Sequence, residues 1–260
     1  MVNLKSFCFK TLYLFSRMAR LWFHLVAFLV LCGGPVIAQK SGNFSYSVDG
    51  NKVTITGYPT TATGSVVIPD TIADKPVTSI GYWAFRSCDK LTSVTIGKGV
   101  TDIGDGAFSG CAKLTSVTIP DSVTRIGTGA FNKCLELTSV KLPDTLTSIG
   151  KNVFTNCAKL TSVTIPKNVA DIGSSAFGGC VKLQSMTLPK SVTGIGDYAF
   201  AGCAGMTDLY FEGDAPKFGH AVFSLIDNKK LKLTIQEGSK GFESPKLKDF
   251  TRAIKARPKN

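Results

Sequence analysis

Apolar residues recur with a period of 23 residues through the middle of this 260-residue chain. Aligned on their first apolar residue, five copies run from Leu91 to Gly205: LTSVTIGKGVTDIGDGAFSGCAK, LTSVTIPDSVTRIGTGAFNKCLE, LTSVKLPDTLTSIGKNVFTNCAK, LTSVTIPKNVADIGSSAFGGCVK and LQSMTLPKSVTGIGDYAFAGCAG. A degraded copy precedes them from Val66 to Lys90, and another follows from Met206 to about Asp227. A fixed period of this length is typical of a solenoid, in which each repeat buries its apolar face against its neighbours.

Each copy divides into a strand half and a return half, as the copy from Leu114 to Glu136 illustrates. Val117 and Ile119 alternate with hydroxyl residues, which predicts a short strand with one buried face. A proline usually follows and ends this strand, because proline has no amide donor. The return half carries apolar residues close to a helical spacing: Val123, Ile126, Ala130, Phe131 and Cys134. This spacing predicts a short helical turn that leads back to the next strand.

Three residue types keep the same place in nearly every copy. Phenylalanine recurs at 85, 108, 131, 154, 177, 200 and 223, cysteine at 88, 111, 134, 157, 180 and 203, and glycine at 81, 104, 127, 150, 173, 196 and 219. The glycines predict either a positive φ or a close backbone approach once per coil. The cysteines belong to the buried apolar set and point the same way in adjacent coils. This favours buried free thiols over disulfides or a metal site.

The L-x-x-V-x-I-P strand and the I-G-x-x-A-F-x-x-C return resemble the 23-residue unit of the BspA-like leucine-rich repeat family. The resemblance extends over about Asn43 to Phe250. It implies an α/β solenoid with short parallel strands on a concave face, short helical turns on the return and a cap at each end.

Both ends of such a stack need a cover, because a terminal coil exposes apolar side chains and an unpaired strand edge. Residues 39–65 are predicted to form an N-terminal β cap, a hairpin around the turn at Asp49-Gly50. The repeats occupy residues 66–227, about seven copies of which the first and last are degenerate. Residues 228–260 are predicted to form a C-terminal cap and basic tail. The cap combines a last strand over residues 231–235 with a closing helix that begins at Ser244-Pro245 and carries Leu247.

Residues 1–38 are predicted to be a signal peptide. The segment from Leu21 to Cys32 is apolar except for His24, follows basic residues and precedes a small-residue cleavage site that ends at Ala38. Two alternatives stay open: a lipid on Cys32, which would attach the protein to a membrane, and an uncleaved anchor. Met18 is an alternative start. We expect an exported protein, whether secreted, periplasmic or on the outer surface.

The net charge of +12 is unevenly distributed. The first 38 residues hold four basic residues, and residues 229–260 hold ten basic residues against three acidic ones, so the repeats are nearly neutral. The basic patch of the tail includes Lys246, Lys248, Arg252 and Lys255. Such a patch attracts acidic lipid, glycan or nucleic acid. A solvated cap face is the favoured interpretation, and we do not expect nucleic acid as a partner of an exported chain.

Residues that catalysis needs are scarce. His220 is the single histidine after Ala38, and the sequence contains no nucleophile elbow, glycine-rich phosphate loop or metal-spaced His/Cys cluster. The acidic residues of the repeats fall at variable positions and offer no carboxylate pair for glycoside hydrolysis. We therefore expect a protein that is not an enzyme and that needs no cofactor.

The candidate binding residues are those that interrupt a monotonous surface. The outward strand positions are almost all serine or threonine, and only Lys141, Asp208 and Tyr210 depart from this pattern. Trp83 occupies a variable position beside the Phe85 core site, where it either packs on the inserted loop at residues 73–76 or serves as a ligand platform. Because hot spots are rich in tyrosine and tryptophan, we expect the contact at Tyr210, with the rim at Trp83 as the alternative.

These features indicate a protein that acts by binding. The family resemblance implies adhesion to host matrix proteins or to other cells. The alternative is a structural role in the periplasm or envelope, with self-association or another envelope protein as the contact and no host ligand.

Overall fold

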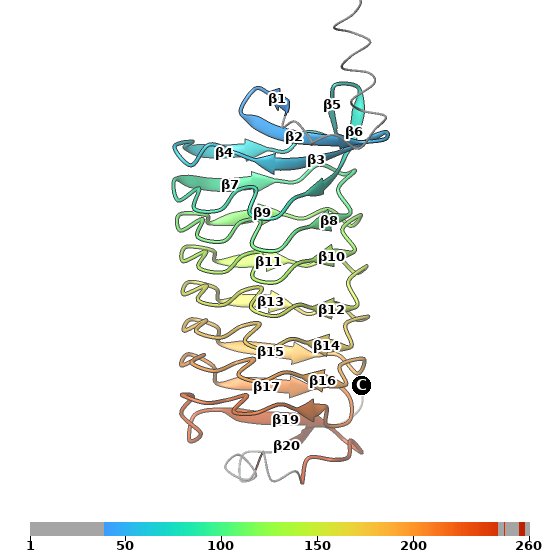
Figure 1. The fold of residues 1–260 in the computed structure, drawn as a ribbon. Helices are drawn as coiled ribbons and strands as arrows, with labels where there is room; N and C mark the ends of the chain where they lie inside the picture. The colour runs from blue at the N-terminus through green and yellow to red at the C-terminus, as the bar shows by residue number, and fades with distance from the viewer. Residues whose placement is uncertain (1–38, 244–246, 248–254, 258–260) are drawn as a thin grey trace, which may run out of the picture. The chain divides into compact units, whose positions relative to one another are not determined.

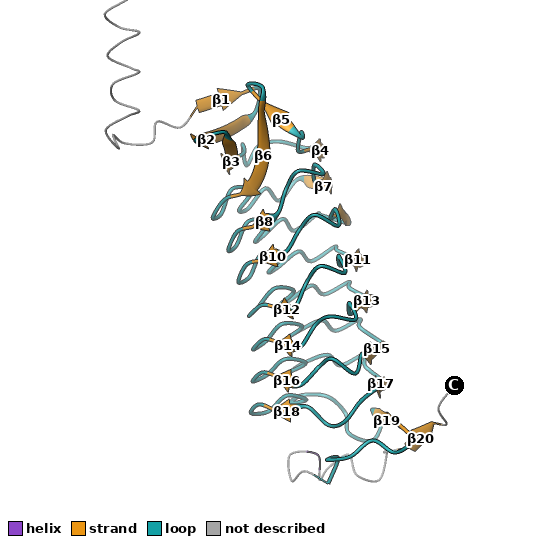
Figure 2. Cartoon of the chain, turned by 90° about the vertical axis from the view of Figure 1, so that its right-hand side faces the viewer, coloured by secondary structure: helices purple, strands orange, loops and turns teal. Residues whose placement is uncertain are grey.

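The computed structural model describes residues 39–243, 247 and 255–257, which lie in one unit of the chain that begins at Ala38. The predicted signal peptide lies outside the described residues. Within them the chain forms strands and turns, and it winds into coils that stack along two rows of short strands (Figure 1). Figure 2 shows the two rows on different sides of the coils.

The first row contains the predicted strand of each repeat. Its rungs are β4 (Gly64–Val67), β7 (Leu91–Thr95), β9 (Ser116–Thr118), β11 (Ser139–Lys141), β13 (Ser162–Thr164), β15 (Ser185–Leu188), β17 (Asp208–Phe211) and β19 (Lys232–Gln236). Paired strands of this row run parallel, and residues 23 apart, such as Val140 and Val163, are in register. The buried residues of each strand point inward and the hydroxyl residues outward, as the alternation predicted.

A second row was not predicted. It contains β3 (Lys52–Gly57), β6 (Lys75–Ile80), β8 (Asp102–Ile103), β10 (Arg125–Ile126), β12 (Ser148–Ile149), β14 (Asp171–Ile172), β16 (Gly194–Ile195) and β18 (Lys217–Phe218). Most of these strands have only two residues, and the inner one, such as Ile149, is buried. They too pair in parallel, with Ile149 opposite Ile172.

The prediction of a helical turn in each return is wrong. The amide of Phe131 donates to the carbonyl of Val153 in the next coil at 2.9 Å, and the amides two residues before and after it do the same. The amides in between close turns within their own coil. Gly129 and Lys133 have φ of +62° and +58°, and the equivalent residues of the other coils are left-handed too. A right-handed helix cannot contain such residues, so the return is a chain of turns.

The core is a column of aromatic rings with a column of thiols beside it. Neighbouring phenylalanines from Phe85 to Phe223 stack at centroid distances of 4.9 to 6.0 Å. Tyr58 extends the column at its N-terminal end, 5.0 Å from Phe85. The six cysteines are buried and free, as predicted, and the Sγ of Cys134 donates to the carbonyl of Phe108 at 3.3 Å. Burial raises the pKa of Cys157 and of Cys203 to about 12.

The invariant glycine of each return serves a close approach and not a positive φ. None of the seven has a left-handed φ. A Cβ added to any of them would come within 2.3 to 3.2 Å of an atom of the preceding coil. In Gly173 that atom is the amide nitrogen of Lys151, 2.7 Å away. Glycine therefore sets how closely successive coils pack.

The N-terminal cover agrees with the predicted hairpin. β2 (Phe44–Asp49) pairs antiparallel with β3, and β1 (Gln39–Ser41) adds to the outer edge of β2. The insertion in the first repeat forms β5 (Thr71–Ile72), which pairs antiparallel with β6.

At the C-terminal end β19 is the predicted last strand. The predicted closing helix is not supported, because β20 (Lys255–Arg257) is a strand that pairs parallel with β19. Leu247 is buried, and the remainder of the predicted helix lies outside the described residues.

Candidate binding surfaces

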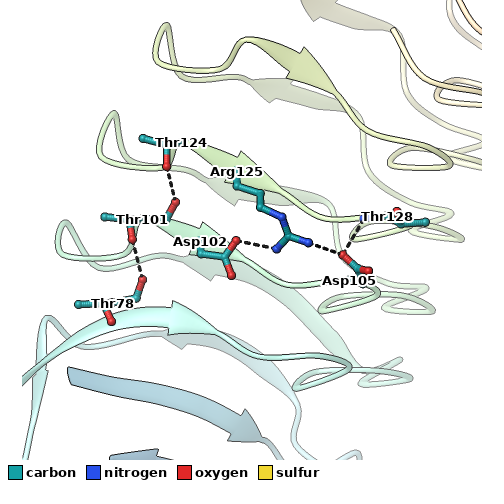
Figure 3. Close-up of polar contacts among 7 residues, drawn as sticks. All are labelled: Thr78, Thr101, Asp102, Asp105, Thr124, Arg125 and Thr128. Atoms are coloured by element: carbon teal, nitrogen blue, oxygen red, sulfur yellow. Dashed lines mark hydrogen bonds and ion pairs between the residues drawn. The ribbon is translucent and has the colours of Figure 1, made fainter. Parts of the chain in front are cut away.

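The strand face is the outer side of β7, β9, β11, β13, β15 and β17. Threonines immediately before these strands bond to the preceding coil: Thr115 Oγ1 donates to the carbonyl of Thr92 at 2.9 Å, and Thr161 Oγ1 donates to that of Thr138 at 3.1 Å. The outer side of the second row repeats this arrangement, with Thr124 on Thr101 at 3.2 Å (Figure 3). These hydroxyls hold coils together, and they leave a surface with few anchors for a partner.

Two of the predicted strand-face residues lie together and the third lies apart. Asp208 and Tyr210 are alternate residues of β17, and both are half-buried. The carboxylate of Asp208 accepts a hydrogen bond from Thr207 Oγ1 at 2.8 Å. Tyr210 stands in register with Thr187 and Thr234 of the flanking strands. Lys141 is exposed on β11, three rungs away, which is about 14 Å at the usual strand spacing.

Trp83 belongs to a cluster on a different surface, the return face, which we define as the outer side of the turns between the second-row strand and the next first-row strand. The ring of Trp83 stacks on Tyr82 at a centroid distance of 4.2 Å, and the guanidinium of Arg86 lies 4.1 Å from its centroid. Tyr82 is 61% exposed and Trp83 is 44% exposed. The indole also covers Gly106, where an added Cβ would lie 2.3 Å from its Cδ1.

Tyr82 and Arg86 were missed as members of this cluster. The signal that could have found them is the spacing Tyr82-Trp83-x-x-Arg86, since a turn brings residues three apart onto one side. Contact with Gly106 also shows that Trp83 packs on the following coil, a contact that neither interpretation of Trp83 included.

The predicted basic patch lies almost entirely outside the described residues. Lys246, Lys248 and Arg252 lie outside the described residues. Lys255 begins β20, but its side chain is also outside what the structure describes.

The described residues offer little for chemistry. Among residues 39–243 and the short segments after them, no group of three or more His, Cys, Asp or Glu residues is placed to hold a metal ion. His220 is exposed and meets Tyr198 edge to face at 5.5 Å. The same part of the chain contains no helix long and apolar enough to cross a membrane.

Comparison with known proteins gives the family. The model of the BspA type leucine rich repeat region matches residues 60–180 and 148–253, with six copies. This chain therefore belongs to the BspA-type leucine-rich repeat family. No curated protein matches it significantly.

Two solved structures are similar to it. One is the leucine rich repeat protein of T. pallidum, with a TM-score of 0.65 and 34% identity, over 71% of this chain and 87% of that one. The other is a leucine rich cell surface protein from Faecalibacterium prausnitzii A2-165, with a TM-score of 0.55 and 30% identity. That match covers 69% of this chain and 56% of the other chain.

Proposed function

We propose that this chain is an exported, surface-exposed protein that binds a protein partner through the C-terminal part of its strand face. The carrying observation is the pair Asp208 and Tyr210 on β17, where an aromatic and a charged residue replace the serine and threonine of most other rungs. Tyrosine is enriched among hot spots. Strand pairing on both sides holds Tyr210 in place before the partner arrives, which lowers the entropic cost of binding.

The surface location rests on the predicted signal and on the relatives. The F. prausnitzii protein is described as a cell surface protein. Host matrix or host cells as the partner follow from the family resemblance alone. The competing function is that of a periplasmic or envelope scaffold without a host ligand. Protease treatment of intact cells separates them, because an adhesin is cleaved and a periplasmic scaffold is protected.

The contact itself is tested by capture from host matrix and envelope fractions with the purified protein, followed by affinity measurement on the captured partner. Tyr210→Ala should weaken binding by about 2 kcal/mol or more, the hot-spot range. Thr187→Ala is the matched control, since Thr187 is the residue in register with Tyr210 on β15, and it should change affinity little. Unchanged binding by Tyr210→Ala would move the contact elsewhere.

A further inference from the structure

A hollow of about 510 Å³ lies on the return face beside the Tyr82–Trp83–Arg86 cluster. It runs across four coils, which at the usual strand spacing is about 14 Å. Its lining includes Gly106, Gly129, Asn132, Lys133 and Asn152. The two glycines are buried, so polar side chains supply its hydrogen-bonding groups, and the volume lies in the range of small-ligand sites.

The aromatic cluster at the edge of this hollow is costly to the fold. Trp83 has a φ of +54°, and Gly106 and Gly129 occupy the same place in the next two coils with φ of +62°. A bulky residue is unfavourable in the left-handed region, where glycine has no such penalty. Trp83 recovers part of this cost through its contacts with Tyr82, Arg86 and Gly106, but 44% of the residue stays exposed. Strained residues of this kind cluster at functional sites.

The polar side of the hollow is held by an ion-pair network. Arg125 donates to Asp102 at 2.7 Å and to Asp105 at 2.8 Å, and the amide of Thr128 donates to the same Asp105 oxygen at 3.1 Å (Figure 3). One guanidinium shared by two carboxylates leaves this network with a charge of −1, and Asp105 is its carboxylate that lines the hollow.

Two further cations make the net charge of the hollow positive. Arg86 and Lys133 both line it, and neither has an ion-pair partner among the described residues. The Oδ1 of Asn132 is buried without a hydrogen-bond partner in the same set of residues. The hollow thus combines an exposed ring, polar side chains and a net positive charge.

We propose that this hollow binds a short oligosaccharide that carries carboxylate or sulfate groups. The C–H side of a sugar ring would stack on the exposed face of Tyr82, because the face of an aromatic ring is electronegative. Sugar hydroxyls would bond to Asn132 and Asn152, and the acidic group would pair with Lys133 and Arg86. The site differs in face and in ligand class from the protein contact at β17.

A peptide or protein partner fits the hollow less well. Apart from Tyr82 and Trp83, its lining is glycine and polar or charged residues, so an apolar side chain of a partner would have only these two rings to contact. A stable protein interface buries about 800 Å² on each partner and is centred on a desolvated apolar core. The rigid ring stack and dense hydrogen-bonding groups favour a sugar instead.

Calorimetric titration of the full exported protein tests this proposal, with a chondroitin sulfate hexasaccharide as the acidic probe and chitohexaose as the neutral one. We expect the acidic probe to bind and the neutral probe to bind at least tenfold more weakly. Trp83→Gly and Lys133→Gln should each weaken binding of the acidic probe at least tenfold.

Tyr198→Gly is the matched control, because Tyr198 is exposed and left-handed at the same place in a distant coil. It should bind as the parent does, and so should Tyr210→Ala, which separates this site from the protein contact. Thermal unfolding of each variant shows that the fold is kept. No binding, equal binding of the two probes, or undiminished binding by folded Trp83→Gly would overturn the proposal.

Discussion

The strand face and the return face belong to the same coils, yet the backbone conformation restricts their outer side chains to different degrees. On the strand face the backbone is extended, and threonine hydroxyls such as that of Thr115 bond to the neighbouring coil. On the return face two residues per coil are left-handed, and their identities range from glycine to tryptophan. A bulky side chain is conformationally free on the first face and costly on the second. An exposed aromatic on the return face that also lines a hollow, as Trp83 does, is therefore the stronger indication of function.

The inner sides of the coils carry the stability. The phenylalanine column, the thiols and the close-approach glycines all lie in the return layer, whereas the outer hydroxyls of the strand face are exposed. If this division is right, perturbing the inside of the return should be far more damaging than perturbing the outside of the strands.

The largest effect should come from alkaline pH. Burial raises the pKa of Cys88 to about 11 and that of Cys157 and Cys203 to about 12, from 9.0. Because folding raises these pKa values, the protonated thiols contribute fully to the stability of the folded state below pH 9. This contribution is lost as pH rises through 11 to 12. Each thiol should lower the free energy of unfolding by at most about 1.4 kcal/mol per pH unit between pH 9 and its pKa in the folded protein. Urea unfolding at pH 8, 9, 10 and 11 measures this.

The variant Cys157→Ala isolates the contribution of one thiol, because every other residue is the same in the two proteins. It should be less stable at pH 8, since it leaves a cavity, but its stability should fall less steeply above pH 9. Identical slopes for the two proteins would show that the thiols do not control the alkaline transition.

The second effect compares the inside of the return with the outside of the strand. Phe131 is fully buried between rings at 5.3 and 5.7 Å. Phe131→Ala should cost roughly 3–5 kcal/mol. Thr138→Ala, on the strand face, removes one exposed hydrogen bond to Thr115 and should cost no more than about 1 kcal/mol. Chemical denaturation measures both, and similar costs would contradict the division.

The sequence predicted the elements whose residue types recur at fixed positions in the repeats. Alternation identified the first row of strands, and the regular phenylalanine and cysteine positions identified the core. The second row was missed because its strands are two residues long and only one of them, such as Ile149, is apolar. A strand that short has no periodicity to detect.

The helical return was wrong for a specific reason. Its apolar spacing matches a helix, and the left-handed residues that exclude a helix are often ordinary ones, such as Lys133 and Tyr198. Only the tertiary contact with the next coil fixes their φ. The candidate site shows the same limit, because Trp83 could be named from its sequence position but the stacking of Tyr82 and Arg86 on it depends on the turn.

The third effect compares two kinds of glycine in the return, those that allow a close approach between coils and those that have a positive φ. Gly173→Ala places a Cβ 2.7 Å from the amide nitrogen of Lys151, so neighbouring coils must move apart, at about 2–3 kcal/mol. Gly129→Ala meets no backbone of another coil and is strained by its φ of +62° alone, which costs roughly 1–2 kcal/mol. Thermal denaturation of both variants gives the order. A larger loss for Gly129→Ala would mean that turn conformation, and not coil spacing, limits the stack.

The smallest effect is the most informative about the return face. Trp83→Gly and Tyr198→Gly each replace a bulky left-handed residue by glycine, which removes backbone strain of about 1 kcal/mol. Greater freedom of glycine in the unfolded chain offsets part of this gain. Trp83 also loses its stacking on Tyr82 and Arg86, whereas Tyr198 loses one edge contact with His220. The free energy of unfolding should therefore change by less than about 1 kcal/mol in both, with Tyr198→Gly the more stable relative to the parent. A loss above about 2 kcal/mol for Trp83→Gly alone would instead make the indole a structural cover for Gly106, and the energetic argument for a ligand at that ring would fail.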